Sequence, residues 1–326
     1  MKTPLPLFFS YDSSDQLLEA LSEPLQQKYK DEIKRLEACN LPPFVSYAVL
    51  STSMGVSVTL INAIVKNKKN YYRTFTISKG KNKKKRVIEA PKVALKIMQS
   101  WFAYHLSRSN NINISNSAFG FLPGVNGIYE AAKKHCGSKW IFSIDLKDFF
   151  HSIDKEKTAS ALSIIGYTAQ QANKISEIIT YNNHLPQGAP SSPVISNIAF
   201  KETDMEIENA IDGMNINYTR YADDLTFSGS DANFDIEKLK TTIIEIIERN
   251  NWTIAPDKTR ISRHPNRLKV HGFLVHEEKP RLTKGYRNKL RTYKHLASVD
   301  KINTEDKDKI NGHINYGNYI DRLNSD

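Results

Sequence analysis

Three acidic residues carry the clearest chemical signal in the sequence. Asp223 and Asp224 close the tetrapeptide Tyr221-Ala222-Asp223-Asp224, and Asp145 ends the run Trp140-Ile141-Phe142-Ser143-Ile144-Asp145. Three carboxylates brought together can hold two magnesium ions about 3.5–4 Å apart, which stabilise the attacking and leaving oxygens of an in-line phosphoryl displacement. A solvated turn is the alternative, because Asp favours turns through hydrogen bonds to nearby backbone. The acidic pair alone does not decide between them.

Strand patterns flank the acidic pair. Ile216 and Tyr218 alternate with polar residues before it, and Leu225 and Phe227 do so after it. This alternation predicts a hairpin with one packed face and the acids in its turn. Burying adjacent acids without a cation would be costly. A second strand is expected to end at Asp145.

Composition narrows the partners. The chain has 326 residues, 40% of them hydrophobic, enough for a core divided into two or three lobes. Its formal net charge of +11 favours a polyanionic partner, because Lys and Arg bind phosphate backbones and release counterions, although loose non-specific binding would also fit. Cys39 and Cys136 have no metal-ligand or disulfide spacing. Without a signal-peptide layout or an apolar run of roughly 20 residues, we expect a cytoplasmic protein with no membrane partner.

A basic turn and a stiff loop are candidates for nucleotide binding. The turn 79–86 includes Lys84 and Arg86, and its cations suit a triphosphate or a template backbone, although such charge runs are usually solvated. The loop 185–193 contains three prolines and precedes a long helix. Its Gln187-Gly188 pair would allow close backbone approach to a base pair, and a structural connector would also fit.

Apolar periodicity predicts further elements. The helices expected to position these segments include 14–38 at the N-terminus and a stripe from Ile236 to Ile247 covering a sheet. Residues 252–254 are predicted to begin a strand. In the C-terminal tail, Lys284, Arg287 and Arg291 decorate a helix whose other face is apolar, which suits a lobe lying on a duplex.

The order of these motifs resembles the successive blocks of reverse transcriptases. The blocks are Arg86 with Pro91, Ala118-Phe119-Gly120-Phe121, Ile144-Asp145 through Phe149-Phe150, Leu185 through Pro193, Tyr221 through Asp224, Lys258, and Val270-His271-Gly272. The resemblance runs from about Tyr72 to the C-terminus. Residues 185–193 and 219–226 look most like bacterial retron reverse transcriptases. Retrons commonly show Asn-Ala-x-x-His and Val-Thr-Gly where this chain has Ala131-Ala132-Lys133-Lys134-His135 and Val270-His271-Gly272.

The resemblance implies an α+β fold of the right-hand polymerase type, with fingers, a palm built on an antiparallel sheet, and a small helical thumb. The expected division is 1–43 as an N-terminal helical extension, 44–99 as the first part of the fingers, 100–155 as the first part of the palm, 156–192 as the second part of the fingers, 193–277 as the second part of the palm, and 278–326 as the thumb.

The resemblance also assigns roles to residues. The catalytic and metal-binding residues would be Asp145, Asp223 and Asp224. The nucleotide-binding residues would be Arg86, Lys84, Phe150, Gln187, Gly188 and Lys258. The primer- and RNA-binding residues would be Val270, His271, Gly272, Lys284, Arg287 and Arg291. Phe150 matches an aromatic sugar gate that collides with a ribose 2′-hydroxyl, with a core aromatic as the alternative. Lys258 would be a general acid or a phosphate contact, and no histidine is assigned to a metal.

The activity implied is that of a retron RNA-directed DNA polymerase, a nucleotidyltransferase that uses two Mg²⁺ ions, with Mn²⁺ as a substitute. A cognate noncoding RNA would be template and primer, and deoxynucleotides would be added from an internal guanosine 2′-hydroxyl to give multicopy RNA-linked DNA (msDNA). Host RNase H and a separately encoded effector for phage defence are the other expected partners, in the bacterial cytoplasm. A group II intron-like or other domesticated reverse transcriptase that extends a free 3′-hydroxyl, or a non-catalytic RNA-binding scaffold, remains an alternative.

Overall fold

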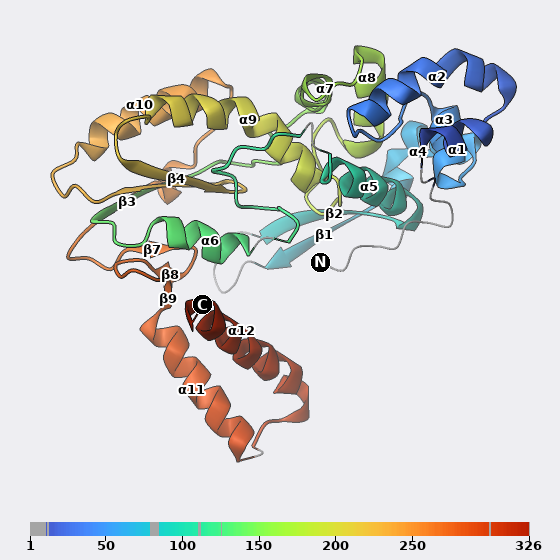
Figure 1. The fold of residues 1–326 in the computed structure, drawn as a ribbon. Coiled ribbons are helices and arrows are strands. Elements are labelled where there is room, and N and C mark those ends of the chain that lie inside the picture. Colours follow the sequence, from blue (N-terminus) through green and yellow to red (C-terminus); the bar gives the residue numbers. More distant parts are fainter. Residues whose placement is uncertain are drawn as a thin grey trace.

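A central sheet lies between a helical end and a projecting helical arm in the computed structural model (Figure 1). The structure describes residues 11, 13–78, 85–109, 112–124, 126–299 and 301–325. The α-helices are α1 (Ser14–Glu19), α2 (Glu23–Ala38), α3 (Tyr47–Met54), α4 (Val58–Lys66), α5 (Val93–Leu106), α6 (Gly127–Lys134), α7 (Lys155–Ile164), α8 (Ala169–Ile179), α9 (Ser192–Ala210), α10 (Ile236–Arg249), α11 (Lys284–Ser298) and α12 (Lys307–Ser325). The strands are β1 (Tyr72–Ser78), β2 (Lys85–Pro91), β3 (Trp140–Asp145), β4 (Ile216–Tyr221), β5 (Asp224–Gly229), β6 (Arg260–Arg263), β7 (Lys269–Val270), β8 (Phe273–Leu274) and β9 (Arg281–Leu282).

Strands β4, β5, β3 and β6, in that spatial order, form the antiparallel palm sheet. The predicted acidic hairpin is confirmed as β4 and β5, and the predicted strand ending at Asp145 is β3, the inner neighbour of β5. The strand predicted at 252–254 is wrong. Ile254 makes only an isolated bridge to Leu146, and the chain enters a 3-10 helix at Pro256–Lys258 before β6 pairs with β3. Proline at the start of that helix has no N–H for a ladder.

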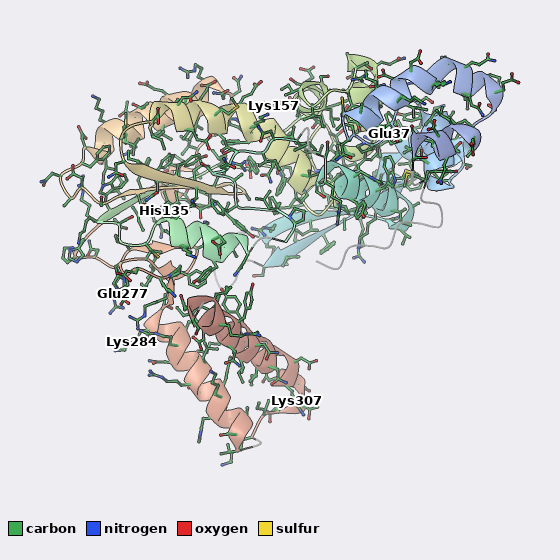
Figure 2. The ribbon with its side chains drawn as sticks, in the orientation of Figure 1. Glu37, His135, Lys157, Glu277, Lys284 and Lys307 are labelled. Carbon is green, nitrogen blue, oxygen red and sulfur yellow. The ribbon has the colours of Figure 1, made fainter. Side chains whose placement is uncertain are left out.

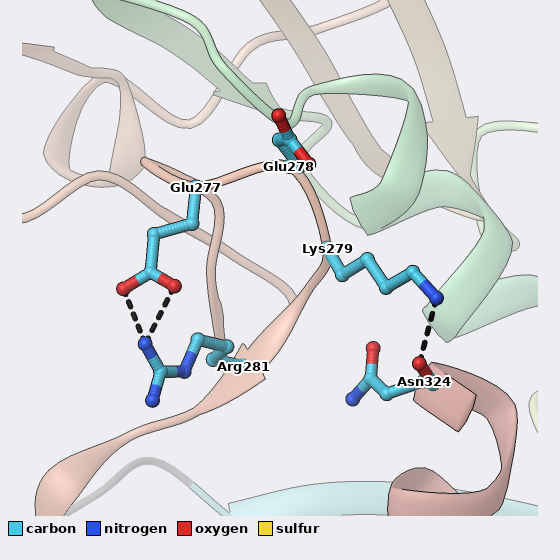
Figure 3. Close-up of a pocket in the computed structure, with 5 residues that line it drawn as sticks. All are labelled: Glu277, Glu278, Lys279, Arg281 and Asn324. Atoms are coloured by element: carbon cyan, nitrogen blue, oxygen red, sulfur yellow. Dashed lines mark hydrogen bonds and ion pairs between the residues drawn. The ribbon is translucent and has the colours of Figure 1, made fainter.

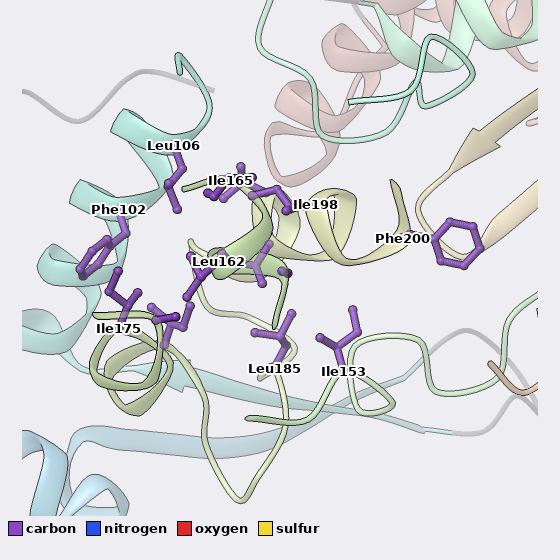
Figure 4. Close-up of a cluster of buried hydrophobic side chains, with 14 of the residues drawn as sticks. Phe102, Leu106, Ile153, Leu162, Ile165, Ile175, Leu185, Ile198 and Phe200 are labelled. Atoms are coloured by element: carbon purple, nitrogen blue, oxygen red, sulfur yellow. The ribbon is translucent and has the colours of Figure 1, made fainter. Parts of the chain in front are cut away.

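Helices α9 and α10 cover one face of the palm sheet (Figure 1). The predicted apolar stripe of α10 is confirmed, because Ile236, Leu239, Ile243, Ile246 and Ile247 are all buried. The same hydrophobic core continues under α5, α7 and α8, where side chains from these three helices meet side chains from α9 (Figure 4). Fingers and palm therefore share one packed interior.

The N-terminal extension is two helices rather than the single helix predicted for 14–38. Helix α2 begins at Glu23 with Pro24 in its first turn, and a proline there cannot continue a preceding helix. Ser14 nevertheless ties the two together, because its backbone N–H and its hydroxyl both donate to the Glu37 carboxylate. Arg35 donates to the carbonyl of Gly166, so the extension packs on the fingers.

The thumb is an arm of two helices, α11 and α12, that leaves the palm at β9 (Figure 1). Leu290 of α11 packs against Gly317 of α12, where an added Cβ would lie 2.6 Å from the Leu290 side chain. The end of α12 returns to the palm, since the Tyr129 hydroxyl donates to the carbonyl of Leu323. A second hydrophobic cluster, including Val270 and Phe273, fills this junction.

The described residues contain no single helix long and apolar enough to cross a membrane. Helices α3 and α4, which are bent by 118° relative to each other, have the length and apolar composition of a membrane span only when they are counted together.

A fully buried ion pair joins α9 to β4. Arg220 donates through Nε and Nη2 to both carboxylate oxygens of Asp204, at 2.7–3.1 Å, and both side chains are fully buried. Tyr218 donates its hydroxyl to the same carboxylate, while the Asn197 amide oxygen accepts from Arg220. Each charge is therefore paired and hydrogen-bonded, as burial requires.

Replacing Asp204 by Ala should lower the free energy of unfolding by about 3–5 kcal/mol, because it leaves the Arg220 guanidinium buried without its carboxylate. Urea denaturation measures the change. Glu206→Ala is the matched control on the same helix, since its ion pair with Arg249 is solvent-exposed and should contribute about 1 kcal/mol or less. A loss at Asp204 no larger than at Glu206 would contradict the expectation.

Candidate active site

The three predicted acids converge at one end of the palm sheet. Asp145 and Asp224 are directly opposite each other in the β3–β5 ladder, and Asp223 occupies the turn between β4 and β5. Cross-strand partners place their Cβ atoms about 4.5–5.5 Å apart. The backbone N–H of Leu146 donates to the carbonyl of Asp223 at 2.8 Å, which fixes the turn against the end of β3.

Electrostatics at these acids favour a cation. Burial raises the pKa of the Asp223 carboxyl, and the nearby Asp145 carboxylate raises it further. Lys258 forms an ion pair with Asp145, with 2.5 Å between its Nζ and Oδ1. Burial acts to lower the pKa of Lys258, but the hydrogen bond and attraction to Asp145 raise it. The acids thus hold an ammonium group at the position where positive charge is needed.

The backbone around the acidic turn is tightly specified. Ala222 has φ of 58°, in the left-handed region that non-glycine residues seldom adopt, and its side chain is buried. Gly120 lies against it, since an added Cβ would stand 2.7 Å from the Ala222 nitrogen. Phe119 donates its N–H to the carbonyl of Arg220, and Arg220 donates to Ser117. The predicted Ala118–Phe121 block is therefore a support for the turn.

The turn between β7 and β8 brings a histidine to the acids. His271 and Gly272 both have positive φ, 47° and 90°, as a two-residue hairpin turn requires. His271 Nδ1 lies 3.5 Å from an Asp224 oxygen, and its ring stands 5.3 Å from that of Tyr221. Val270 differs from the other predicted primer contacts, because its side chain is buried in the hydrophobic cluster at the base of the thumb. Only its backbone could contact a primer.

The predicted nucleotide-binding loop packs on the fingers strand β2. Glu89 donates its N–H to the carbonyl of Gln187 at 2.9 Å. Gly188 has φ of 129°, and a Cβ there would lie 2.9 Å from the Ile88 side chain. The loop thus follows β2, the strand that carries the exposed Arg86. Lys84 lies outside the described residues.

Phe150 occupies a different environment from its neighbour Phe149. The Phe149 ring is buried between Phe200 and Trp252, at 5.9 and 5.6 Å. Phe150 is only partly buried, and its ring faces that of Phe121 at 6.0 Å. Phe121 in turn stands 6.3 Å from the Tyr221 ring, next to the acids. Phe150 therefore lies at the edge of the core, with part of its side chain exposed.

Comparison with known proteins agrees with this geometry. Residues 66–287 match the family model described as reverse transcriptase (RNA-dependent DNA polymerase). The chain belongs to the reverse transcriptase family. It is 31% identical over 246 residues to the retron Ec86 reverse transcriptase of Escherichia coli, covering 75% of this chain and 76% of that protein. It is 28% identical over 294 residues to the retron Mx162 reverse transcriptase of Myxococcus xanthus, covering 81% and 59% respectively.

The reverse transcriptase has the expected right-hand polymerase fold, and it is an RNA-directed DNA polymerase. A solved structure of telomerase from Candida albicans overlaps 74% of this chain and 55% of its own chain, with a TM-score of 0.43 and 10% identity.

The predicted basic residues of the thumb do not join the acids. Lys284 and Arg291 are exposed on α11, on the projecting arm (Figure 2), and Arg287 is half-buried beside them. A cavity of about 420 Å³ lies at the base of this arm, lined by Glu277, Glu278, Lys279, Arg281 and Asn324 (Figure 3). Its lining contains none of the described predicted site residues, so it is separate from the polymerase centre.

His135 ends the block in which Ala131 replaces the Asn common in retrons. It is a structural residue of this reverse transcriptase. It is fully buried between α6 and the palm sheet (Figure 2). Its Nδ1 and Nε2 each lie 2.7 Å from a hydroxyl, those of Ser228 and Thr219. Ala131 is also fully buried. Neither side chain can therefore contact RNA from these positions.

Burial of His135 should make folding sensitive to acid. Burial lowers the pKa of its imidazole to about 3, against about 6.5 in an unfolded chain. Between these values the unfolded chain binds a proton that the folded protein does not. The free energy of unfolding should thus be highest above about pH 6.5 and should fall on acidification by up to about 1.4 kcal/mol per pH unit.

Urea denaturation at neutral pH and near pH 5 tests this. His135→Gln should reduce the acid-induced loss by about 2 kcal/mol, because Gln does not titrate. His295→Gln is the control, since His295 is exposed on α11 and should leave the loss unchanged. Equal acid sensitivity of the wild type and His135→Gln would contradict the assignment.

Proposed function

We propose that this reverse transcriptase copies a cognate structured noncoding RNA into single-stranded DNA by two-metal nucleotidyl transfer. The observation that carries the proposal is the convergence of Asp145, Asp223 and Asp224 at one end of the palm sheet, with Lys258 drawn to them. Support for a retron RNA comes from the relatives, which are named retron reverse transcriptases.

The acids fit a pair of divalent cations. Carboxylate oxygens are hard donors that suit Mg²⁺, with Mn²⁺ as a proposed substitute. The raised pKa of Asp223 reflects burial and a neighbouring negative charge, both of which a cation would relieve. Asp145 and Asp223 are proposed as the principal ligands, and Asp224 as a ligand or an electrostatic support. When bound, the ions would stabilise charge on the attacking and leaving oxygens.

Residues around the acids would bind and orient the nucleotide. Arg86 on β2, with Lys84 before it, is proposed to bind the triphosphate. The backbone of Gln187 and Gly188, already held against β2, would form the side of the pocket that meets the base pair. Lys258, which is paired with Asp145, is proposed to meet the pyrophosphate leaving group as a proton donor or a phosphate contact.

Primer and template would lie toward the thumb. His271 and Gly272 form the turn next to Asp224 and are proposed to contact the primer end. Lys284, Arg287 and Arg291 of α11 would hold the duplex through its phosphates.

The retron relatives also support a biological proposal. One RNA would serve as template and primer, and synthesis would begin at an internal guanosine 2′-hydroxyl to give msDNA. Host RNase H would remove the template, and a separately encoded effector would complete a phage-defence system in the bacterial cytoplasm. The alternatives are extension of a free 3′-hydroxyl and a binding role without catalysis.

The test supplies the purified full chain with its native flanking transcript, deoxynucleotides and Mg²⁺. The expected product is DNA joined to RNA through a bond that a debranching enzyme cleaves. Asp223→Ala should reduce synthesis about 100-fold or more, because a lost metal ligand removes several kcal/mol of charge stabilisation. Asp212→Ala, in the exposed turn that follows α9, is the control and should retain activity.

Three results would revise the proposal. Equal synthesis by Asp223→Ala and the wild type would remove the acids from catalysis. Absence of DNA with the native RNA would favour the binding scaffold. A junction resistant to debranching would favour priming from a free 3′-hydroxyl.

Phe150→Ala should raise incorporation of ribonucleotides relative to deoxynucleotides about 10- to 100-fold, because the ring would no longer meet the 2′-hydroxyl. Competitive incorporation assays measure the ratio. Phe150→Tyr retains the ring and is the matched control, which should keep wild-type sugar selectivity. Unchanged selectivity in Phe150→Ala would take Phe150 out of the gate role.

A further inference from the structure

Three side chains outside the catalytic acids meet at the junction of fingers and palm. They are Glu89 of β2, His151 in the turn that follows β3, and His184 in the turn after α8. Their nearest nitrogen and oxygen atoms all lie within 4.8 Å of one another. Glu89 is almost fully buried, at 5% exposure, so its carboxylate needs a positive partner.

The two ring nitrogens of His184 have different partners. Nδ1 lies 3.1 Å from the carbonyl oxygen of Asn182, which can only accept, so Nδ1 carries the proton. Nε2, the other ring nitrogen, stands 2.8 Å from Glu89 Oε2. Either a proton on Nε2 or a metal ion bound by both atoms would balance the charge of the buried carboxylate. Metal-binding histidines are commonly oriented in this way, by a backbone carbonyl on the other nitrogen.

His151 supplies a second nitrogen. Its Nε2 lies 3.9 Å from the same Glu89 oxygen, and its ring stands 4.2 Å from that of His184. Burial lowers the pKa of His151, which favours the neutral ring with a lone pair on one nitrogen. The cluster therefore offers two imidazoles and one carboxylate.

The spacing suits a tetrahedral metal. Bonds of about 2.0–2.2 Å place tetrahedral ligand atoms about 3.4 Å apart. The two Glu89-to-histidine distances, 2.8 and 3.9 Å, fall on either side of this value. A shift of roughly half an ångström in the carboxylate would equalise them. Imidazole and carboxylate together favour zinc over magnesium, which prefers oxygen ligands alone.

We propose that Glu89, His151 and His184 form a binding site for a transition-metal ion, with zinc as the ion of choice and a fourth position open to water. The three ligands come from the segments that carry Arg86, Phe150 and Gln187. Bound zinc would fasten β2 to the palm at the nucleotide pocket. The site is distinct from the catalytic acids in both its residues and its donor chemistry.

Zinc titration of the full chain, with excess Mg²⁺ present to occupy the carboxylate site, tests the proposal. Zinc at roughly 100-fold above its dissociation constant should raise Tm by about 5 °C, with one equivalent bound by equilibrium dialysis. Cobalt in place of zinc should give the strong visible absorption of a tetrahedral site.

Variants identify the ligands. Glu89→Gln keeps the size of the side chain, and the partly exposed His151 tolerates replacement by Gln, so both variants should fold. Each of them, and His184→Gln, should lose the zinc-dependent rise in Tm. His295→Gln, on the exposed surface of α11, should keep it.

Two outcomes would overturn the site. One is no zinc-dependent shift in the wild type at a roughly 100-fold molar excess of zinc. The other is a shift that survives in Glu89→Gln and His184→Gln. The first result would mean that a proton between His184 and Glu89 takes the place of a metal ion, and the second that zinc binds elsewhere on the chain. The readouts do not involve DNA synthesis, so failure here leaves the polymerase proposal intact, and the reverse holds as well.

Discussion

The buried ion pair of Arg220 and Asp204 is the constraint on which the polymerase centre depends. Removing two charges from water is costly, and the cost is offset only where geometry and hydrogen bonds are complete. Here Asp204 accepts from both Arg220 and Tyr218, and the Phe200 ring lies 4.7 Å beneath the guanidinium. Because Arg220 directly precedes the acidic tetrapeptide, its ion pair with Asp204 fixes α9 to the acidic hairpin.

The same pair organises the segment that supports the turn. Asn197 accepts from Arg220 and donates to the carbonyl of Gly120, so one side chain connects α9 to the Ala118–Phe121 block. That block hydrogen-bonds to the backbone of Arg220 and lies against Ala222. The unusual backbone of Ala222 is thus held from two sides. An unfavourable backbone conformation of this kind persists only where the surrounding contacts hold it in place.

Much of this centre follows from sequence because its signals are local. Alternation of apolar residues identifies β3, β4 and β5, and the period of α10 identifies its buried face. The break between α1 and α2 was missed although Pro24 signals it, since the leucine spacing continues across it. Strand β6 was also missed, because its residues, Arg260–Arg263, are polar and pair on the outer edge of the sheet.

Other features lie beyond the reach of local patterns. Asp204 and Arg220 stand on different elements, and a charged residue in a helix is ordinarily read as solvated. Glu89, His151 and His184 are separated along the chain by whole elements and share no ligand spacing, so no histidine was assigned to a metal. Phe149 and Phe150 are adjacent and chemically identical. Only packing distinguishes the buried ring of Phe149 from the partly exposed ring of Phe150.

The attachment of the thumb has a mechanical consequence. Both ends of the helix pair are fixed at its base, one by β9 and the other by the bond from Tyr129 to Leu323 and that from Lys279 to Asn324. The two helices are therefore attached at their base through both ends, so that moving either helix away from the palm would break these contacts. Force applied to α12 near Ser325 would be carried by the two hydrogen bonds, whereas force at the far end of α11 would act through the full length of that helix (Figure 1).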